Sequence, residues 1–412
     1  MNSRALGRLR ICDLTGQLAG AGATKILAAF GAQVIRVEDP VTGGLWDILR
    51  SLGPYVDERR GANVGGGFNN HNVEKLGVTI NLRTDRGQQL FRRLVAASDA
   101  VTENFAAGVL ARRGFPYEEL KRIKPDIVYV SNCGFGHVGP YRNFKSWGPV
   151  AQAICGLTFS SGLPGLPPAG WGYSFMDHGG AYFMAIAVLA AILHRNRTGE
   201  GQWVDLSCTE AGATLNGPAM LDYTVNRRPL RRDGMPHSNR SQFGEMAPHG
   251  IYPAKGEDRW IAIACRNDAD WHALRDLLKE PWASDAAYAT LEGRRKAEDA
   301  IDRELAAWTR QRDAAATAAL LRRANVPAAA VQRPGERIDE DPNTRDWGLW
   351  PVVEHSEMGE VRVEGLPLRL SETDWQMQRG APCVGEHNDF VFREVLGLTR
   401  AEIQSLQEDG AI

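Results

Sequence analysis

The sequence lacks the signatures of several common chemistries. Its six cysteines lie far apart and none belongs to a C-x-x-C pair, which argues against a zinc knuckle or a dithiol redox pair. It has no HExxH, no phosphate-binding GxxxxGK[ST] and no GxSxG nucleophile elbow, and its nine histidines show no metal-ligand spacing. We therefore predict no metal site, and we expect reduced thiols, as in the cytoplasm.

A strong charge of either sign is also missing. The chain has 48 basic and 50 acidic residues, which argues against nucleic acid or an anionic membrane as its main partner. The N-terminal segment has no apolar core of the kind found in signal peptides. The longest apolar run, Ala181–Leu193, is too short to span a bilayer and predicts a buried helix. These features favour a cytoplasmic protein with no membrane partner.

The first half of the 412-residue chain alternates strand-like and helix-like segments. This alternation predicts an α/β fold with a Rossmann-like parallel sheet. The segment 41–71 is rich in glycine and polar residues, and we expect it to run over the surface. Strands are predicted over 10–14, 33–40, 75–82, 99–105 and 125–136 and at the start of 201–211, with helices over 16–32, 85–98 and 115–123.

The composition changes after residue 225. Residues 226–250 are basic, polar and rich in turn formers, which is typical of a linker into a second domain. A hairpin over 250–265, several helices and a short strand follow, and they predict a smaller α+β domain. The tail contains extended segments and a final helix. The predicted divisions are 1–225, 226–335 and 336–412.

Asp177 is an isolated acid at the beginning of the apolar run. No Asp, Glu, Lys or Arg occurs between it and Arg195, and Gly199 marks the predicted helix end. Two interpretations remain open. The carboxylate is an N-cap, or it is a nucleophile or acid–base group that apolar surroundings make reactive and the helix dipole keeps ionised. In the second case, N–H groups made approachable by Gly179 and Gly180 would hold a developing oxyanion.

A glycine-rich turn follows the first predicted strand. Its glycines, Gly16, Gly20 and Gly22, do not spell GxGxxG, although Glu38 lies near the distance expected of a ribose-binding acid. A nicotinamide cofactor is therefore not favoured. The strand–turn–helix pattern remains compatible with another nucleotide.

Four basic residues stand near the ends of predicted elements: Arg36, Lys75, Arg112 and Arg113. Each alone is typical of a solvated surface charge, whereas the set together would suit the phosphates of a nucleotide. His178 is a candidate base beside the isolated acid, but a polar residue in the first turn of a helix is the commoner explanation.

Several of these segments, taken in order, resemble one family. They include ICDLTGQLAGAGATKILAAFGAQVIRVEDP, NVEKLGVTINL, DAVTENFAAGVLARRGF, VYVSNCGFGHVGPY, MDHGGAYFMAIAVLAAILHRNRTGEGQWVDLS, APHGIYPAKGEDRWIAIA and PCVGEHNDFVFREVLGL. Over nearly its whole length the chain resembles the family III (CaiB/BaiF) CoA-transferases, which include formyl-CoA transferase and α-methylacyl-CoA racemase.

The resemblance implies a reaction in which Asp177 is the catalytic nucleophile. Its carboxylate would attack an acyl-CoA thioester, and CoA would then reach an acceptor carboxylic acid through aspartyl-anhydride and aspartyl-CoA intermediates. CoA is here a substrate, and no tightly bound cofactor is expected. Positions that match the family's CoA contacts are Gln17, Arg36, Lys75, Asn104, Phe105 and Arg112.

The resemblance also implies an assembly. The family fold is an interlocked homodimer whose large Rossmann-like domain contains the N-terminal part and the returning C-terminal segment, with a smaller inserted domain between them. The active site would then lie between the large domain of one subunit and the small domain of the other.

Three departures from the family pattern bear on the reaction. Trp147 and Gly148 stand where racemases of the family place a His–Asp pair, and tryptophan does not shuttle protons at neutral pH. Cys133 replaces a lysine that contacts CoA in some transferases. The glycine-run loop of formyl-CoA transferases is not found over 237–250. The first departure argues against a racemase, and the third argues against oxalate and formate as substrates. The segment WGP after the Gly-rich loop, together with APHGIYP, resembles family members that act on larger dicarboxylic or aromatic acids. An acyl-CoA racemase and a non-catalytic CoA-binding protein remain the alternatives.

Overall fold

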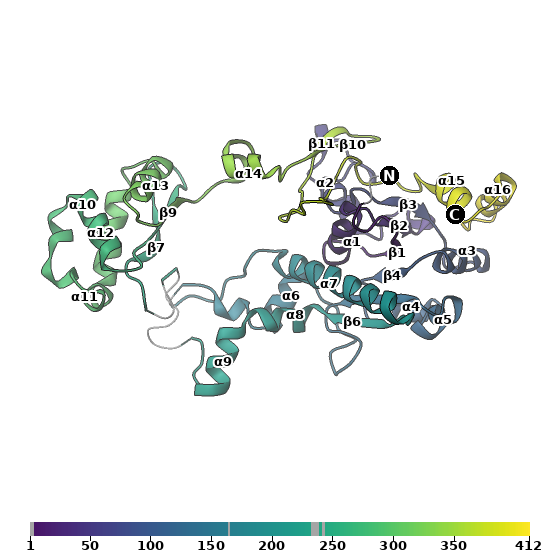
Figure 1. Cartoon of the computed structure of the whole chain (residues 1–412), viewed down its shortest axis with the longest axis horizontal. Coiled ribbons are helices and arrows are strands. Elements are labelled where there is room, and N and C mark those ends of the chain that lie inside the picture. The colour runs from purple at the N-terminus through teal and green to yellow at the C-terminus, as the bar shows by residue number, and fades with distance from the viewer. Residues whose placement is uncertain (1–3, 164, 232–238, 241–243) are drawn as a thin grey trace. The chain divides into compact units, whose positions relative to one another are not determined.

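The computed structural model describes residues 4–163, 165–231, 239–240 and 244–412 (Figure 1). The chain divides into two compact units. Unit 1 contains Met1–Leu157, Gly170–Asn216 and Pro342–Ile412, and unit 2 contains Thr158–Ala169 and Gly217–Asp341. Residues 232–238 and 241–243 of the predicted linker, and with them part of the 237–250 loop, lie outside the described residues.

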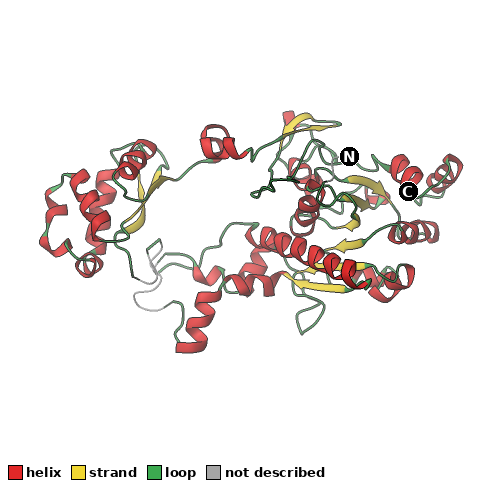
Figure 2. Ribbon diagram, in the orientation of Figure 1, coloured by secondary structure: helices red, strands yellow, loops and turns green. Residues whose placement is uncertain are grey.

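Unit 1 contains a six-stranded sheet in the order β3-β2-β1-β4-β5-β6, and every neighbouring pair is parallel. The predicted parallel sheet is therefore confirmed, and its strands are coloured yellow in Figure 2. The strand order reverses between β1 and β4, which is the place where open α/β sheets bind ligands. The strands are β1 Arg10–Leu14, β2 Gln33–Glu38, β3 Leu76–Thr79, β4 Ala100–Glu103, β5 Val128–Cys133 and β6 Trp203–Ser207.

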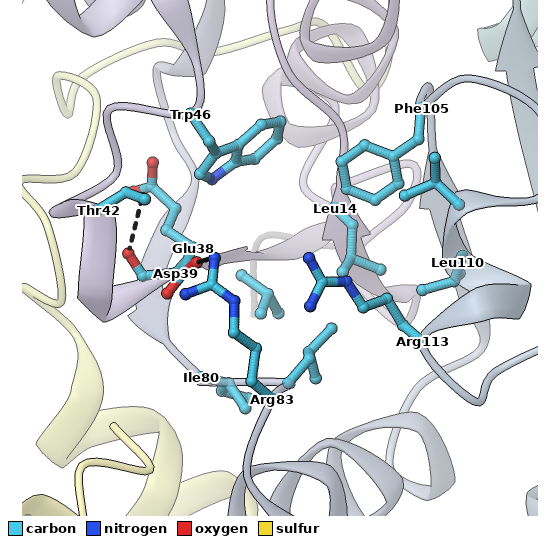
Figure 3. A pocket seen from close by; sticks show the side chains of 13 residues that line it. Leu14, Glu38, Asp39, Thr42, Trp46, Ile80, Arg83, Phe105, Leu110 and Arg113 are labelled. Atoms are coloured by element: carbon cyan, nitrogen blue, oxygen red, sulfur yellow. Dashed lines mark hydrogen bonds and ion pairs between the residues drawn. The ribbon is translucent and has the colours of Figure 1, made fainter.

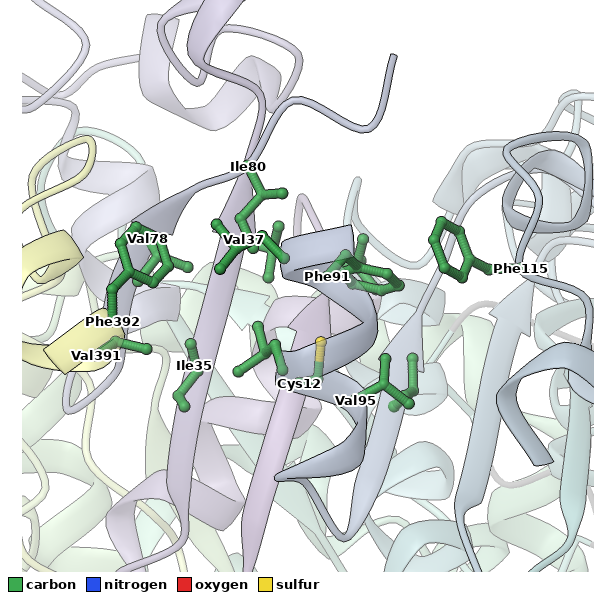
Figure 4. Packing of buried hydrophobic residues seen from close by; sticks show 14 of the residues in the cluster. Cys12, Ile35, Val37, Val78, Ile80, Phe91, Val95, Phe115, Val391 and Phe392 are labelled. Atoms are coloured by element: carbon green, nitrogen blue, oxygen red, sulfur yellow. The ribbon is translucent and has the colours of Figure 1, made fainter. Parts of the chain in front are cut away.

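The two faces of this sheet carry separate apolar cores, because alternate side chains of a strand point to opposite faces. On β1, Ile11 packs against helices α1 and α7, while Cys12 belongs to the other core together with α3 and the C-terminal segment (Figure 4). The helices of unit 1 are α1 Ala19–Ala29, α2 Gly66–Asn72, α3 Asp85–Ala96, α4 Val109–Arg112, α5 Tyr117–Ile123, α6 Gly148–Ile154, α7 Phe175–Thr198, α8 Cys208–Leu215, α14 Pro342–Trp347, α15 Asn388–Phe390 and α16 Arg400–Glu408. A hairpin of β10 Val352–His355 and β11 Gly359–Arg362 also belongs to it.

The prediction of a surface segment over 41–71 holds for residues 51–63, which are exposed or half-buried, but it is wrong on both sides of them. Asp47, Arg50 and Phe68 are buried there, and the Arg50 guanidinium pairs with Glu38. The Arg50 guanidinium also lies 3.6 Å from the centroid of the Phe68 ring. Glycine-rich composition suggested exposure, but the few polar residues form buried ion pairs that composition does not reveal.

Helix α7 is longer and more exposed than the apolar run predicts. Among the described residues it is the one helix long and apolar enough to cross a membrane, and 39% of its most apolar window is buried. One face packs on the sheet, while Tyr182, Ile186, Leu189 and Leu193 are exposed at helical spacing. We call these four side chains the apolar stripe of α7.

Unit 2 contains a three-stranded antiparallel sheet around its own core. Its strands are β7 His249–Pro253, β8 Trp260–Ala264 and β9 Ala328–Ala330, which agrees with the predicted hairpin and short strand. Its helices are α9 Gly217–Asn226, α10 Asp268–Leu278, α11 Leu291–Lys296, α12 Glu298–Thr309 and α13 Ala314–Arg323.

Candidate active site

Two pockets lie in unit 1 beyond the carboxyl ends of the parallel strands. Asn104, which follows β4, fastens the loop after β1. Its Oδ1 accepts from the Gly16 N–H at 2.7 Å, and its Nδ2 donates to the Gly16 carbonyl at 2.9 Å. Asn104 lines one pocket, and its neighbour Phe105 lines the other. The two pockets therefore lie side by side where the strand order reverses, and the adjacent residues Asn104 and Phe105 connect them.

The first pocket, which we call the aspartate pocket, has a volume of about 530 Å³ and contains Asp177. It combines amide, thiol, hydroxyl and apolar side chains from the loops after β1, β4 and β5 with the start of α7. Its lining residues are Gln17, Ala19, Asn104, Asn132, Cys133, Gly134, Ser146, Trp147, Gly148, Ala151, Met176, Asp177 and Cys208.

Asp177 is a half-buried carboxylate in the first turn of α7. Burial raises its pKa to about 6, and a hydrogen bond from its own backbone N–H opposes that rise. Within the described part of the chain, no Lys, Arg or His forms an ion pair with it. Burial thus raises the pKa of Asp177, and no basic side chain among the described residues offsets this rise. Carboxylates with these two properties are common at functional sites.

The glycines around Asp177 differ in what surrounds them. A Cβ on Gly148 would stand 2.1 Å from Asp177 Oδ2, so the carboxylate lies directly on the backbone at the start of α6. A Cβ on Gly180 would stand 2.6 Å from Cys208 Sγ, whereas one on Gly179 would make only ordinary contacts. Gly148 and Gly180 thus permit close approach of backbone and side chains.

The helix begins earlier than predicted, because Phe175 and Met176 precede Asp177 within α7. The His178 N–H already donates to the Ser174 carbonyl, so the unpaired N–H groups of the first turn precede residue 178. Gly179 and Gly180 lie in the second turn, where amides pair with carbonyls four residues earlier. Their role as oxyanion donors remains a prediction.

Gln17 occupies a left-handed backbone conformation, with φ at +54°, on the rim between β1 and α1. Its N–H donates to Asp47 Oδ1 at 3.1 Å, which fixes this turn. The side chain lines the aspartate pocket. Such backbone strain in a residue other than glycine tends to occur at functional sites.

The second pocket has a volume of about 720 Å³, and we call it the arginine pocket (Figure 3). Arg83 and Arg113 extend toward its interior over an apolar floor, and Arg83 is paired with Asp39 at 2.8 Å. Trp46 and Phe105 pack at its edge with ring centroids 5.5 Å apart. Its lining residues are Leu14, Val37, Glu38, Asp39, Thr42, Trp46, Ile80, Leu82, Arg83, Phe105, Val109, Leu110 and Arg113.

The structure does not bring all of the predicted phosphate contacts to these pockets. Arg36 and Lys75 are fully buried, and Arg112 is exposed outside both pockets. The Arg36 guanidinium pairs with Asp47 at 2.7 Å and donates to the Thr15 carbonyl. A direct contact of Arg36 or Lys75 with a ligand phosphate is therefore not supported, since protein groups occupy their charged ends.

Arg83 was missed at the level of sequence, whereas Arg113 was among the four basic residues considered there. Arg83 directly follows the strand predicted over 75–82, and this position would have indicated a basic side chain at the carboxyl edge of the sheet. His178 lines neither pocket, and its ring lies 5.9 Å from that of His71.

Lys75 instead belongs to a buried network around Asp13. Its ammonium lies 3.2 Å from Asp13 Oδ2 and also donates to Asn72 and to the Ala21 carbonyl. Lys75 and Arg36 lower the pKa of Asp13 against the effect of burial, and burial lowers the pKa of Lys75 to about 8. This network holds β1, α1 and the loop before β3 together beneath the pockets.

Replacing Asp13 by asparagine should therefore lower the free energy of unfolding by about 3–5 kcal/mol, because the buried Lys75 ammonium loses its counter-charge. Urea denaturation at neutral pH measures this. Glu292→Gln is the matched control, since its ion pair with Lys296 is exposed and should contribute no more than about 0.5 kcal/mol. A loss below about 1 kcal/mol for Asp13→Asn would contradict the assigned role.

Comparison with known proteins shows which proteins this chain resembles. A family model described as CoA-transferase family III matches residues 6–388. The chain is 31% identical to the succinyl-CoA–D-citramalate CoA-transferase of Chloroflexus aurantiacus, covering 98% of this chain and 97% of the relative. It is 30% identical to the formyl-CoA:oxalate CoA-transferase of Rhodopseudomonas palustris, covering 100% and 98%. The crystal structure of a CAIB/BAIF family protein from Brucella suis superimposes with a TM-score of 0.85 at 29% identity, covering 95% and 99%.

Proposed function

Because the chain belongs to CoA-transferase family III, we propose that it transfers CoA from an acyl-CoA to a free carboxylic acid with Asp177 as the nucleophile. One observation carries this proposal: Asp177 is the carboxylate of the aspartate pocket, it is half-buried, and burial raises its pKa. A carboxylate with little water around it is a better nucleophile than one in bulk solvent.

The proposed reaction proceeds through four acyl transfers. A carboxylate oxygen of Asp177 attacks the thioester carbonyl, the C–S bond breaks, and CoA leaves as a thiolate. The thiolate attacks the aspartyl carbonyl of the resulting anhydride and releases the first acid. The acceptor carboxylate attacks the aspartyl-CoA thioester and again displaces the thiolate, which finally attacks the acceptor carbonyl. Asp177 is regenerated as a carboxylate, so no external oxidant, reductant or water is consumed.

The surroundings of Asp177 suit these steps. Trp147, Ala151 and Met176 add apolar surface to an otherwise largely polar lining, and they would limit the access of water to the anhydride. Gln17 lines the same pocket, and its side-chain amide forms no hydrogen bond with the other described residues. We assign this amide as a donor to the oxyanion that forms on the thioester carbonyl.

The arginine pocket suits the nucleotide end of CoA. Its floor is apolar and its rim aromatic, as an adenine ring requires, and two guanidinium groups extend into it. Asn104 and Phe105 are adjacent residues that line different pockets, so a pantetheine arm laid along them would join the two. Gln17, Asn104 and Phe105 thus remain in the proposed CoA site, and Arg83 and Arg113 replace Arg36, Lys75 and Arg112 as phosphate ligands.

Arg113→Ala and Arg83→Ala should each raise KM for acyl-CoA by roughly 10- to 100-fold, the loss expected for a charge-assisted hydrogen bond to phosphate. Steady-state kinetics with acyl-CoA and with acyl-pantetheine measure this, and the effect should vanish with the substrate that lacks the nucleotide. Arg112→Ala is the matched control and should stay within about twofold. A larger increase in KM for Arg112→Ala than for Arg113→Ala would contradict this assignment and would support Arg112 as the phosphate ligand, as predicted from the sequence.

The rate of transfer should depend on the ionisation of Asp177. Only the carboxylate attacks the thioester, so kcat/KM should be constant above a pH of about 7 and fall roughly tenfold per unit below about 6. A pH–rate profile with a donor and acceptor that do not titrate in this range measures the effect. An inflection near 4, the ordinary value for an aspartate, would show that desolvation does not tune this group.

Trapping the intermediate tests the proposal directly. The protein is incubated with acyl-CoA alone, treated with hydroxylamine or borohydride, digested and examined by mass spectrometry. We expect a modified peptide that contains Asp177, as a hydroxamate or an alcohol. A modification at another acid, with Asp177 unmodified, would overturn the assignment.

Two further proposals extend the family membership. The exposed apolar stripe of α7 supports a homodimer, interlocked as the resemblance implies, which light scattering of the purified protein tests. The relatives act on succinyl-CoA with D-citramalate and on formyl-CoA with oxalate, as their names state. We keep the preference for larger dicarboxylic or aromatic acids, and a panel of CoA donors and acceptor acids tests it.

A further inference from the structure

Three side chains with metal-binding atoms converge beside the aspartate pocket. Cys133 ends β5, His137 lies in the loop that follows, and Asp205 belongs to β6. Cys133 Sγ lies 3.8 Å from His137 Nδ1, and Asp205 Oδ1 lies 2.9 Å from the same nitrogen. One ligand atom from each residue lies within 4.8 Å of the other two. Sequence spacing gave no sign of this group, because β5 and β6 are neighbours in the sheet but far apart in the chain.

The geometry of this group argues against a Cys–His–Asp catalytic triad. In a triad, the nucleophile and the carboxylate bond to opposite nitrogens of the imidazole ring. Here the thiol and the carboxylate both approach Nδ1 of His137. Three potential ligand atoms that lie within 4.8 Å of one another are instead compatible with a metal site.

The separations are close to those that a metal ion requires. Bonds of about 2.0–2.3 Å in a tetrahedron place the ligand atoms of zinc roughly 3.3–3.6 Å apart. The observed 3.8 Å and 2.9 Å differ from these values by a few tenths of an ångström. The third pair, Cys133 Sγ and the Asp205 carboxylate, lies within 4.8 Å, so coordination of an ion requires rotation of these side chains. The His137 ring is held edge-on to Trp203, with centroids 5.2 Å apart, and this contact keeps its orientation.

The charges around the group favour a cation. Glu103 is buried beside it, and its Oε1 accepts from the Tyr129 hydroxyl at 2.8 Å. Among the described residues neither Glu103 nor Asp205 forms an ion pair with a lysine or an arginine. Among the described residues, Asp205 forms an ion pair only with His137, so a bound cation would give this exposed carboxylate a second partner.

We propose that Cys133, His137 and Asp205 bind a borderline-soft divalent metal ion of the Zn²⁺ class. The Cys133 thiol gives up its proton to solvent as the metal–sulfur bond forms, neutral His137 binds through Nδ1, Asp205 binds through a carboxylate oxygen, and water completes the tetrahedron. Cys133 lines the aspartate pocket, so the ion would lie at the edge of that pocket. The site is separate from the proposed transfer reaction and does not depend on it.

Cobalt(II) tests the proposal, because a thiolate ligand gives it an intense near-ultraviolet charge-transfer band. The full chain, first treated with a chelator, is titrated with Co²⁺. We expect that band together with tetrahedral ligand-field bands, and their loss when Zn²⁺ is added but not when Mg²⁺ is added. His137→Ala and Asp205→Asn should each weaken cobalt affinity by at least about 100-fold, beyond the cost of losing an outer-shell partner.

Cys133→Ser should abolish the charge-transfer band. Cys208→Ser is the matched control, because Cys208 lines the same pocket but lies outside the group, and it should keep the band. Circular dichroism checks that each variant is folded, and Asp205→Asn decides the question if Cys133→Ser is not. No band with folded protein, or a band that survives in Cys133→Ser, overturns the proposal.

Discussion

Asp177→Asn is expected to lower kcat by at least about 10⁴-fold and to leave no covalent adduct after incubation with acyl-CoA. An amide cannot replace the carboxylate as nucleophile, and no other carboxylate lines the aspartate pocket. KM should change little, because the arginine pocket is untouched. Single-turnover measurements of CoA thiol release, followed with a thiol reagent, separate this loss of chemistry from any change in binding.

The same substitution should stabilise the folded protein at neutral pH. Burial raises the pKa of Asp177 from 3.8 to about 6, so the native state binds this proton more tightly than the unfolded state does. Between about pH 4 and 6 the carboxyl is ionised in the unfolded state but still protonated in the native state, so the wild-type chain loses stability as pH rises through this range. Asparagine does not ionise and avoids this loss. The Tm of Asp177→Asn should exceed that of the wild type above about pH 6, and the two should converge near pH 4.

Together these measurements separate a catalytic aspartate from a helix cap. A cap that only accepts backbone hydrogen bonds would destabilise the helix when removed and would leave transfer activity largely intact. A variant that is less stable but still active would therefore contradict the proposal for Asp177.

Gly148→Ala is expected to lower kcat by about 100-fold. The new methyl carbon would stand 2.1 Å from Asp177 Oδ2 and 2.9 Å from the Tyr173 carbonyl oxygen, so the carboxylate must move by roughly an ångström. A displacement of this size is enough to lose about two orders of magnitude from a positioned reaction. KM for acyl-CoA should remain within a few-fold, because Gly148 lies outside the arginine pocket.

Gly170→Ala is the matched control for this experiment. Its new methyl carbon would have one neighbour, Gln152 Oε1, at the ordinary contact distance of 3.7 Å. Rate and KM should stay within about twofold of the wild type. If Gly148→Ala is equally harmless, the carboxylate does not react from the place that it occupies here.

The sequence was sufficient to predict the parallel sheet. An apolar segment before a glycine-rich turn, a β-branched segment that ends at Pro40 and a segment that ends at a polar pair predicted the strands β1, β2 and β4. Local pattern and buried position agree in a parallel sheet. Gln17 and Asn104 come together for the same reason, since parallel strands place their carboxyl ends at one edge.

The roles of the basic residues were harder to predict, because charge alone does not tell a buried ion pair from a free ligand. Arg36 and Lys75 follow the family pattern, yet their side chains meet carboxylates inside the protein. Arg83 and Arg113 extend into a pocket, although Arg83 also pairs there with Asp39. Which partner a guanidinium meets is decided by how the following loops fold back, as with Asp47, which lies 11 residues beyond Arg36.

One helix carries both Asp177 and the apolar stripe that follows it. A continuous backbone of hydrogen-bonded turns is stiff along its length, so a shift or rotation imposed on the stripe is transmitted to the first turn. In the homodimer proposed above, a partner chain that covered Tyr182 and Ile186 would therefore also influence the position of the Asp177 carboxylate.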